Sequence, residues 1–239
     1  MIGITFALRS ESSDLVRRLQ EIQRHDDLIS GKIDPPSPSL RRAGNHDVTI
    51  AHTGVGAKNC GARLERLVHK AKPRLVISCG FAGGVSDQLR VGDLILAENF
   101  SDMQLLSSAQ RIVANEQTHI VKLFTATSII ESVAERNEIA RASGAAAVDM
   151  ETGAIAAVCT THGLPLLSLR VISDTPSEPF PAPMSILFDL ETQRTDMRKL
   201  FGYIIAGPTR IIRLLHFFRQ TRQARALLTK AIVALIREL

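Results

Sequence analysis

The chain has 239 residues, of which 45% are hydrophobic and 22% are charged, and its formal net charge is +5. This length suits one large α/β domain or two small ones, and the apolar content is ample for a buried core. Cys60, Cys79 and Cys159 are widely spaced and odd in number, which argues against a disulfide framework and predicts a reducing cytoplasm.

Two membrane-related classes are not expected from the sequence. Residues 1–8 predict a strand, and Arg9 and Glu11 interrupt it before a signal-length apolar core forms, so no N-terminal signal is expected. The longest uncharged run, from Thr152 to Leu169, contains threonine, histidine, glycine and proline. It fits a helix, a turn and a strand better than a transmembrane span.

The positive charge is concentrated at the C-terminus. Residues 194–239 hold ten basic and two acidic residues, whereas residues 1–193 hold 19 basic and 22 acidic residues. The sequence pI of about 9.4 therefore describes a basic tail on a mildly acidic body.

The chain begins with a predicted strand over residues 2–8, followed at once by a helix. Ser12, Ser13 and Asp14 supply N-cap chemistry for that helix. Its apolar stripe is formed by Leu15, Val16, Leu19 and Ile22. Glu11 then falls between a strand end and a helix start. Two interpretations stay open, a functional carboxylate displayed at the sheet edge or an acid that favours the helix dipole.

The next part of the chain predicts a loop, a strand and a helix. Residues 31–39 contain three prolines and predict a loop. A strand over residues 47–53 and a helix over residues 57–70 lie on either side of Gly54-Val55-Gly56. Such a glycine pair allows close approach of the backbone to a ligand, but ordinary tight turns use it as well.

A glycine-rich segment follows the apolar strand predicted over residues 75–79. An uninterrupted apolar strand is typical of a parallel sheet that is covered on both faces. The glycines of Gly80-Phe81-Ala82-Gly83-Gly84 let a ligand come close to backbone N–H groups. We therefore predict a binding loop here, with an ordinary surface loop as the alternative, and another strand over residues 91–97.

Two later strands each end in an acid. A predicted strand over residues 145–148 runs into Asp149-Met150-Glu151 and then into a helix. The strand over residues 166–172 stops at Ser173-Asp174. Ligands usually bind outside the carboxyl ends of the strands in an α/β sheet. The pattern therefore predicts one site with two carboxylates. A strand over residues 121–125 and a helix over residues 132–142 precede them, and residues 101–118 show no clear pattern.

The alternation of strands and helices predicts a doubly wound α/β sheet in three layers. We expect a catalytic domain over residues 1–190 and a basic, amphipathic, helical C-terminal extension over residues 191–239 packed on it. After Asp174 the chain contains four prolines between residues 176 and 183, which predict either a lid or an ordered surface loop.

The C-terminal extension contains a stripe at helical spacing, formed by Ile211, Leu214, Leu215 and Phe218, with arginines around it. A basic amphipathic helix can lie on an anionic membrane surface, and it can also pack on its own domain with a solvated basic face. Nucleic-acid binding is not expected, because no nucleic-acid-reading motif appears among the arginines. The seven histidines show no metal-ligand spacing among themselves or with the cysteines, so neither a metal nor a cofactor is predicted.

Three motifs in register resemble the purine nucleoside phosphorylase superfamily, and the similarity is greatest to its 5′-methylthioadenosine/S-adenosylhomocysteine nucleosidases. The motifs are Ser78–Gly84 with Val91-Gly92-Asp93, then Val148–Glu151, then Arg170–Asp174. The resemblance covers about residues 2–174. It implies a three-layer α/β/α fold with a mixed central sheet and a homodimer or higher homo-oligomer.

The resemblance also implies roles for individual residues. Asp174 matches the acid that donates a proton or a hydrogen bond to purine N7. Glu151 matches the acid that binds the ribose hydroxyls, and Met150 the methionine packed against the sugar. Glu11 matches the acid that orients the attacking water. The ligand loop corresponds to Gly80, Phe81 and Gly83, and Ile129 matches a residue that contacts the base through its backbone.

The sequence departs from the nucleosidase pattern in several places. Phe81 replaces a serine, and Ser128 stands where a phenylalanine stacks on adenine. Ser78 matches a phosphate-binding serine of the phosphorylases. The arginine expected just before that serine is either replaced by Leu75 or displaced to Arg74. The tail resembles that of hopanoid-associated phosphorylases, which act on an adenosyl group attached to a lipid.

These residue types suit the cleavage of an N-ribosidic bond. The purine departs as N7 is protonated, and general acid help of this kind contributes about 10²–10⁴-fold. An ionised carboxylate beside the ribose stabilises the cationic sugar. The sequence therefore predicts hydrolysis of an adenine nucleoside of the methylthioadenosine type. The alternatives are phosphorolysis, including of an adenosyl lipid, and a nucleoside-binding or membrane-surface protein without activity.

Overall fold

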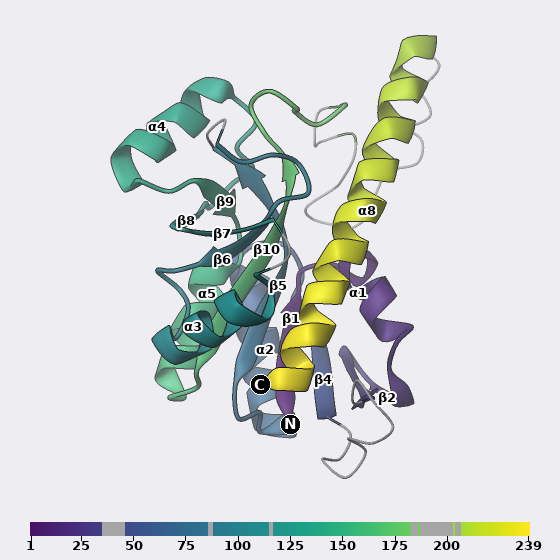
Figure 1. The fold of residues 1–239 in the computed structure, drawn as a ribbon, viewed down its shortest axis with the longest axis vertical. Coiled ribbons are helices and arrows are strands. Elements are labelled where there is room, and N and C mark those ends of the chain that lie inside the picture. Colours follow the sequence, from purple (N-terminus) through teal and green to yellow (C-terminus); the bar gives the residue numbers. More distant parts are fainter. Residues whose placement is uncertain (35–45, 86–87, 115–116, 183–185, 187–202, 204–206) are drawn as a thin grey trace.

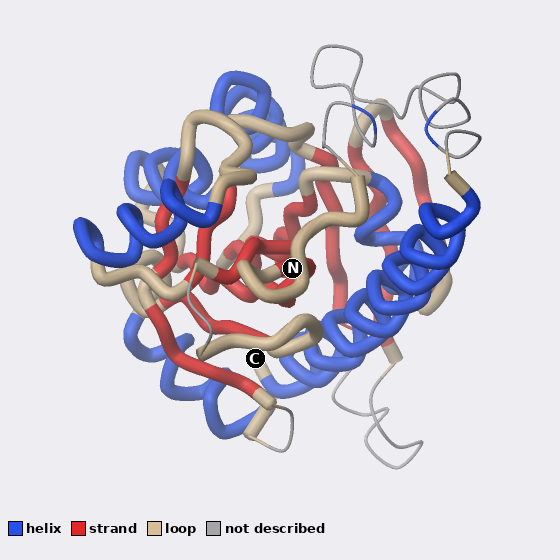
Figure 2. Tube along the Cα trace, turned by 90° about the horizontal axis from the view of Figure 1, so that it is seen from above, coloured by secondary structure: helices blue, strands red, loops and turns tan. Residues whose placement is uncertain are grey.

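The computed structural model describes residues 1–34, 46–85, 88–114, 117–182, 186, 203 and 207–239. These residues form one mixed ten-stranded sheet with helices on both faces, as Figure 1 shows from the side and Figure 2 from above. The predicted three-layer α/β/α architecture is confirmed.

The strands are β1 (Ile2–Phe6), β2 (Gln20–His25), β3 (Leu28–Ile33), β4 (His46–His52), β5 (Val76–Gly84), β6 (Leu94–Ala97), β7 (Thr118–Val121), β8 (Leu123–Thr125), β9 (Ala147–Asp149) and β10 (Leu166–Asp174). Their order is β2-β3-β4-β1-β5-β10-β6-β7, with β9 paired to β5 and β8 paired to β9. The central strands β4, β1, β5 and β10 are parallel. Because their carboxyl ends meet at one edge, a ligand site is expected there.

The helices are α1 (Arg9–Val16), α2 (Ala57–Ala71), α3 (Met103–Ile112), α4 (Val133–Ser143), α5 (Thr152–Thr161) and α8 (Pro208–Glu238). Residues of α1, α3 and α8 share one buried cluster with β1, and residues of α2 and α5 share another with β4 and the start of β10. The sheet is therefore covered on both faces, and this explains why β1 and β5 are apolar without alternation.

Three local predictions near the N-terminus and in the glycine-rich segment were wrong. The first helix begins at Arg9, so Glu11 lies in its first turn, and it ends at Val16 because the chain turns into the hairpin β2–β3. Gly31 lies inside β3 and not in a loop. The glycine-rich segment continues β5, because β10 and β9 pair with it on its two sides. The prolines at 35, 36 and 38 lie outside the described residues.

The helix α8 has two halves with different surroundings. In its C-terminal half, Leu228, Ile232 and Leu235 are buried in the main core. In its N-terminal half, which extends beyond the sheet in Figure 1, only Leu214 of the predicted stripe is buried. This helix therefore packs on the main core through residues 228–235, which lie further along the chain than the predicted stripe. Whether the chain divides near residue 190 stays a prediction, because residues 187–202 lie outside the described ones.

Among the described helices, none combines the length and the apolar character needed to cross a membrane.

Candidate active site

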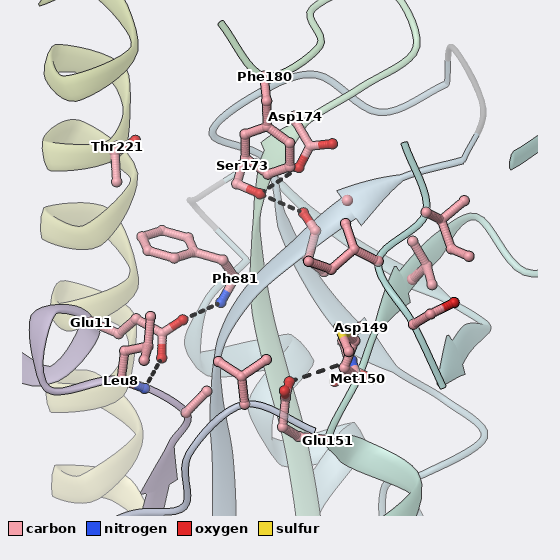
Figure 3. Close-up of a pocket in the computed structure, with 18 of the residues that line it drawn as sticks. Leu8, Glu11, Phe81, Asp149, Met150, Glu151, Ser173, Asp174, Phe180 and Thr221 are labelled. Carbon is pink, nitrogen blue, oxygen red and sulfur yellow. Dashed lines mark hydrogen bonds between the residues drawn. The ribbon is translucent and has the colours of Figure 1, made fainter. Parts of the chain in front are cut away.

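A pocket of about 330 Å³ lies at the carboxyl ends of β1, β5 and β10 (Figure 3). Its volume is within the range of small-molecule sites. The lining residues come from seven parts of the chain, and those used below are Glu11, Phe81, Gly83, Ile129, Arg136, Met150, Glu151, Asp174, Phe180 and Phe217. The structure thus gathers side chains that are more than 200 residues apart in sequence.

Glu11 lies in the first turn of α1, and two backbone N–H groups hold its carboxyl group. Leu8 N donates to Glu11 Oε2 at 2.9 Å, and Phe81 N donates to Oε1 at 3.4 Å. The side chain is 5% exposed. Burial raises the pKa of Glu11, while the Leu8 N–H and the charge of Arg170 act in the opposite direction. The result is a carboxylate with a defined orientation that faces the pocket, as Figure 3 shows.

Glu151 is the N-cap residue of α5 and also touches the start of α2. Its Oε1 accepts a hydrogen bond of 2.8 Å from Gly56 N, so the Gly54-Val55-Gly56 turn serves this carboxylate. Burial, together with the nearby Asp149 carboxylate, raises the pKa of Glu151 to about 7. Near neutral pH the ionised form of Glu151 is therefore populated together with its protonated form.

Asp174 at the end of β10 is paired with an arginine that the sequence did not point to. Its Oδ2 is hydrogen-bonded to Arg136 Nη2, and its Oδ1 accepts a hydrogen bond of 2.7 Å from Ser173 Oγ. Asp174 and Arg136 are 2% and 3% exposed. Burial raises the pKa of Asp174, and the guanidinium charge opposes this shift. The balance between the two effects controls the proton on this carboxyl group.

Arg136 is fixed by further contacts. It donates to Gly84 O at 2.7 Å and to Ile130 O at 3.2 Å, so α4 is tied to the end of β5. A Cβ atom at Gly83 would lie 3.3 Å from Asp174 Oδ2 and 3.4 Å from Arg136 Nη1. The absence of a side chain at Gly83 therefore gives this ion pair its room. No pattern in the sequence linked position 136 on a helix to position 174 on a strand.

One side of the pocket is aromatic. Phe180 and Phe217 lie edge to face with ring centroids 5.6 Å apart, and Phe81 of β5 also lines the pocket. Phe180 and Phe217 were not among the predicted site residues, because Phe217 lies on α8 and Phe180 in the proline-rich segment. That segment is described as far as Ala182, and Pro183 lies outside the described residues.

Two predicted ligand residues lie away from this pocket. Ser78 is fully buried, and its Oγ accepts a hydrogen bond of 2.8 Å from Arg170 Nη2. Arg170 also donates to Asp149 Oδ2 and to Thr152 Oγ1, so these side chains form a buried network under the site. Gly80 lines a small cavity next to Glu11. A Cβ atom at this position would lie 3.4 Å from Glu11 Oε1.

Comparison with known proteins agrees with this picture. The family description "Phosphorylase superfamily" matches residues 2–113 and 102–206. The chain belongs to the phosphorylase superfamily. Proteins named 5′-methylthioadenosine/S-adenosylhomocysteine nucleosidase from Staphylococcus haemolyticus and Staphylococcus aureus are 26% and 25% identical to it, over 73% of this chain and 86% of theirs.

Two solved structures share the fold of this chain. The 5′-methylthioadenosine/S-adenosylhomocysteine nucleosidase of Campylobacter jejuni superposes with a TM-score of 0.73 at 18% identity, over 100% of this chain and 99% of that one. The futalosine hydrolase of Helicobacter pylori gives 0.71 at 16% identity, over 100% and 97% of the two chains. At these identities the structural likeness bears on the fold alone.

Proposed function

We propose that this superfamily member is an enzyme that hydrolyses the N-ribosidic bond of an adenine nucleoside. Its relatives from Staphylococcus are named 5′-methylthioadenosine/S-adenosylhomocysteine nucleosidases. The observation that carries the proposal is the convergence of Glu11, Glu151 and Asp174 on one pocket of about 330 Å³. In Figure 3, Asp174 lies toward one end of the group and Glu151 with Met150 toward the other. In this proposal the base lies beside Asp174 and the sugar beside Glu151 and Met150.

In this proposal each carboxyl group has one task. Asp174 holds a proton or hydrogen bond for purine N7, and its burial favours the protonated form. Arg136 stabilises the carboxylate that remains after the proton leaves. Glu151 in its ionised form accepts hydrogen bonds from the ribose hydroxyls and stabilises positive charge on the sugar. Glu11 polarises the attacking water.

The charges around the pocket favour water over phosphate as the acceptor. Among the described lining residues Arg136 is the one basic side chain, and Asp174 already pairs with it. A phosphate near the sugar would lie close to the carboxyl groups of Glu11 and Glu151, and like charges at short range disfavour binding. Ser78, the matched phosphate-binding residue, is instead occupied by Arg170.

A product assay tests the proposal. Adenosine, inosine, methylthioadenosine and a lipid-linked adenosine are each incubated with the protein, with and without phosphate. Hydrolysis predicts adenine and the free sugar at a rate that does not depend on phosphate. Formation of a ribose-1-phosphate product only when phosphate is present would favour phosphorolysis, and no release from any substrate would favour a protein that binds nucleosides without activity.

A lipid-linked adenine nucleoside is the second candidate substrate, and the exposed surface at the N-terminal half of α8 favours it. Phe217 in the aromatic wall is followed by Phe218, whose ring centroid lies 6.1 Å from that of Phe217 and whose side chain is 53% exposed. The N-terminal half of α8 also exposes Ile212 and Leu215, with Arg213, Arg219 and Arg222 exposed around them. Such a surface suits an anionic membrane that presents the 5′ substituent to the pocket.

Vesicle flotation tests the membrane contact. The variant Ile212→Glu/Leu215→Glu should float less with vesicles that contain anionic lipid than the wild-type protein does. The control is Met103→Glu, because Met103 on α3 is also highly exposed, at 80%. Equal flotation of all three proteins, or none, would exclude this role for α8. A homo-oligomer and a cytoplasmic location stay predictions, which sedimentation analysis and cell fractionation can test.

A further inference from the structure

Outside the pocket, on the face formed by α2 and α5, the structure brings two histidines and a carboxylate together. Glu65 and His69 lie four residues apart on α2, and His162 is the C-cap residue of α5. One possible ligand atom from each of the three side chains lies within 4.8 Å of those from the others. Among the described residues this cluster has no part in the site above, and none of its members lines the pocket.

The distances suit a single small ion. His162 Nε2 is 2.7 Å from Glu65 Oε2, and His69 Nε2 is 3.6 Å from the same oxygen. Zinc bonds of about 2.0–2.1 Å in a tetrahedral arrangement place neighbouring ligand atoms about 3.3 Å apart. The observed separations lie on either side of that value. Small side-chain rotations, with the ion replacing the proton between His162 and Glu65, would satisfy it.

The backbone that carries these side chains is well supported. Cys60 and Leu64 of α2 pack against Ile155 and Cys159 of α5 in a buried cluster. The end of α5 is closed by Leu164 N donating to Cys159 O at 2.9 Å, which fixes the position of His162. The rings of His69 and His162 meet edge to face with centroids 5.6 Å apart. A site on two packed helices is more precise than one on loops.

We propose that Glu65, His69 and His162 form a zinc-binding site that ties α2 to α5. Two imidazoles and one carboxylate are a ligand set that zinc uses, with water in the fourth position, and imidazole disfavours magnesium and calcium. Solvent can reach the ion because the side chain of His69 is 73% exposed and that of Glu65 is 38% exposed. Glu151 is the N-cap residue of α5 and accepts a hydrogen bond from Gly56 N at the start of α2. About three turns of α5 separate it from His162, so the ion would brace the two helices about 16 Å from Glu151, judged from the helical rise.

Calorimetric titration of the full chain, first treated with a chelator, tests the site. Zinc chloride should bind with one equivalent, and magnesium chloride should not bind. His69→Gln and His162→Gln should each weaken zinc binding by at least roughly 100-fold, since even outer-shell changes cost 10–100-fold. Cobalt(II) should give the visible absorption of a tetrahedral complex with the wild-type protein and not with these variants.

His119→Gln is the matched control, because His119 Nε2 lies 3.3 Å from the Asp93 carboxylate and, among the described residues, His119 belongs to no cluster of three possible ligands. It should bind zinc as the wild-type protein does. If His69→Gln and His162→Gln also bind as the wild type, or if the wild type shows no saturable binding, the site does not exist. Should His162→Gln fail to fold, His69→Gln decides alone, since its side chain is largely exposed.

Discussion

At the residue scale, the ion pair between Asp174 and Arg136 is the most consequential contact in the pocket. A buried carboxylate without a partner would hold its proton strongly, and a buried carboxylate beside an arginine loses it more easily. The pair therefore lets the protein set the acidity of the group that would face purine N7. It also explains why Gly83 has no side chain, because a Cβ atom there would crowd both members.

Replacing Asp174 by asparagine removes the titratable proton. We expect turnover of the best adenine nucleoside to fall by at least ~10²-fold, with the circular dichroism spectrum unchanged. The matched control is Asp93→Asn, because Asp93 is also buried, at 5% exposure, but lies outside the pocket. Release of adenine by Asp174→Asn at a near wild-type rate would remove Asp174 from the mechanism.

Replacing Arg136 by methionine removes the charge that lowers the pKa of Asp174. The pKa of Asp174 should rise, so the loss of kcat/KM on the alkaline side of the pH profile should begin at higher pH than in the wild type. Arg141→Met on the exposed side of the same helix should leave the profile unchanged. An alkaline limb that stays in place, or moves to lower pH, in Arg136→Met would contradict this role.

At the element scale, α8 joins two environments. Its C-terminal half belongs to the core with β1, and a hydrogen bond of 2.8 Å from Arg225 Nε to Asp14 Oδ2 ties it to α1. Its N-terminal half supplies Phe217 and Thr221 to the pocket and leaves Ile212 and Phe218 exposed. The buried half therefore holds the exposed half in place beside the pocket.

Truncation of one side chain in each half separates the two environments. Ile232→Ala should lower the free energy of unfolding by about 2–5 kcal/mol, because Ile232 is fully buried. Ile212→Ala should change it by less than about 0.5 kcal/mol, because Ile212 is 69% exposed. Urea titrations of both variants give the comparison. Similar losses for the two would mean that the N-terminal half of α8 is covered in solution.

At the scale of the whole molecule, folding buries several carboxyl groups at one edge of the sheet. Desolvation raises the pKa of Glu11, Glu151 and Asp174, and backbone N–H groups and arginines offset part of the cost. The site is therefore assembled at some expense in stability. That expense depends on pH, because it applies to the charged forms.

The pH dependence of stability gives a test with a definite sign. The pKa of Glu151 is raised from 4.5 to about 7 on folding. The contribution of this carboxyl group to the free energy of unfolding is therefore fully present below pH 4.5 and is lost as pH rises to 7. Glu151→Gln removes this loss. The free energy of unfolding of Glu151→Gln minus that of the wild type should rise by about 3 kcal/mol between pH 4 and pH 8. A difference that is constant with pH would show that the pKa of Glu151 is not raised.

The sequence by itself indicated β4, α2, β5, α4, β9, α5 and β10 in their order and the edge of the sheet where a site would lie, but not α3, which falls in the patternless residues 101–118. Apolar runs such as that of β10 can satisfy their burial only inside a covered sheet, and the acids that follow such runs must then come out at its carboxyl edge. Asp174 and Glu151 were predicted for that reason, and Glu11 was named with two interpretations left open, a functional carboxylate or an acid that favours the helix dipole.

Only the tertiary structure decided which partners those acids meet. Helices carry Arg136 and Phe217, and His162 caps another. The periodicity of a helix predicts which side is buried, but it does not predict which segment that side packs against. The pairing of Arg136 with Asp174, the aromatic wall and the histidine cluster all arise between segments far apart in the chain. Electrostatics and ligand geometry depend on distances of a few ångströms, and such distances exist only after the layers have packed.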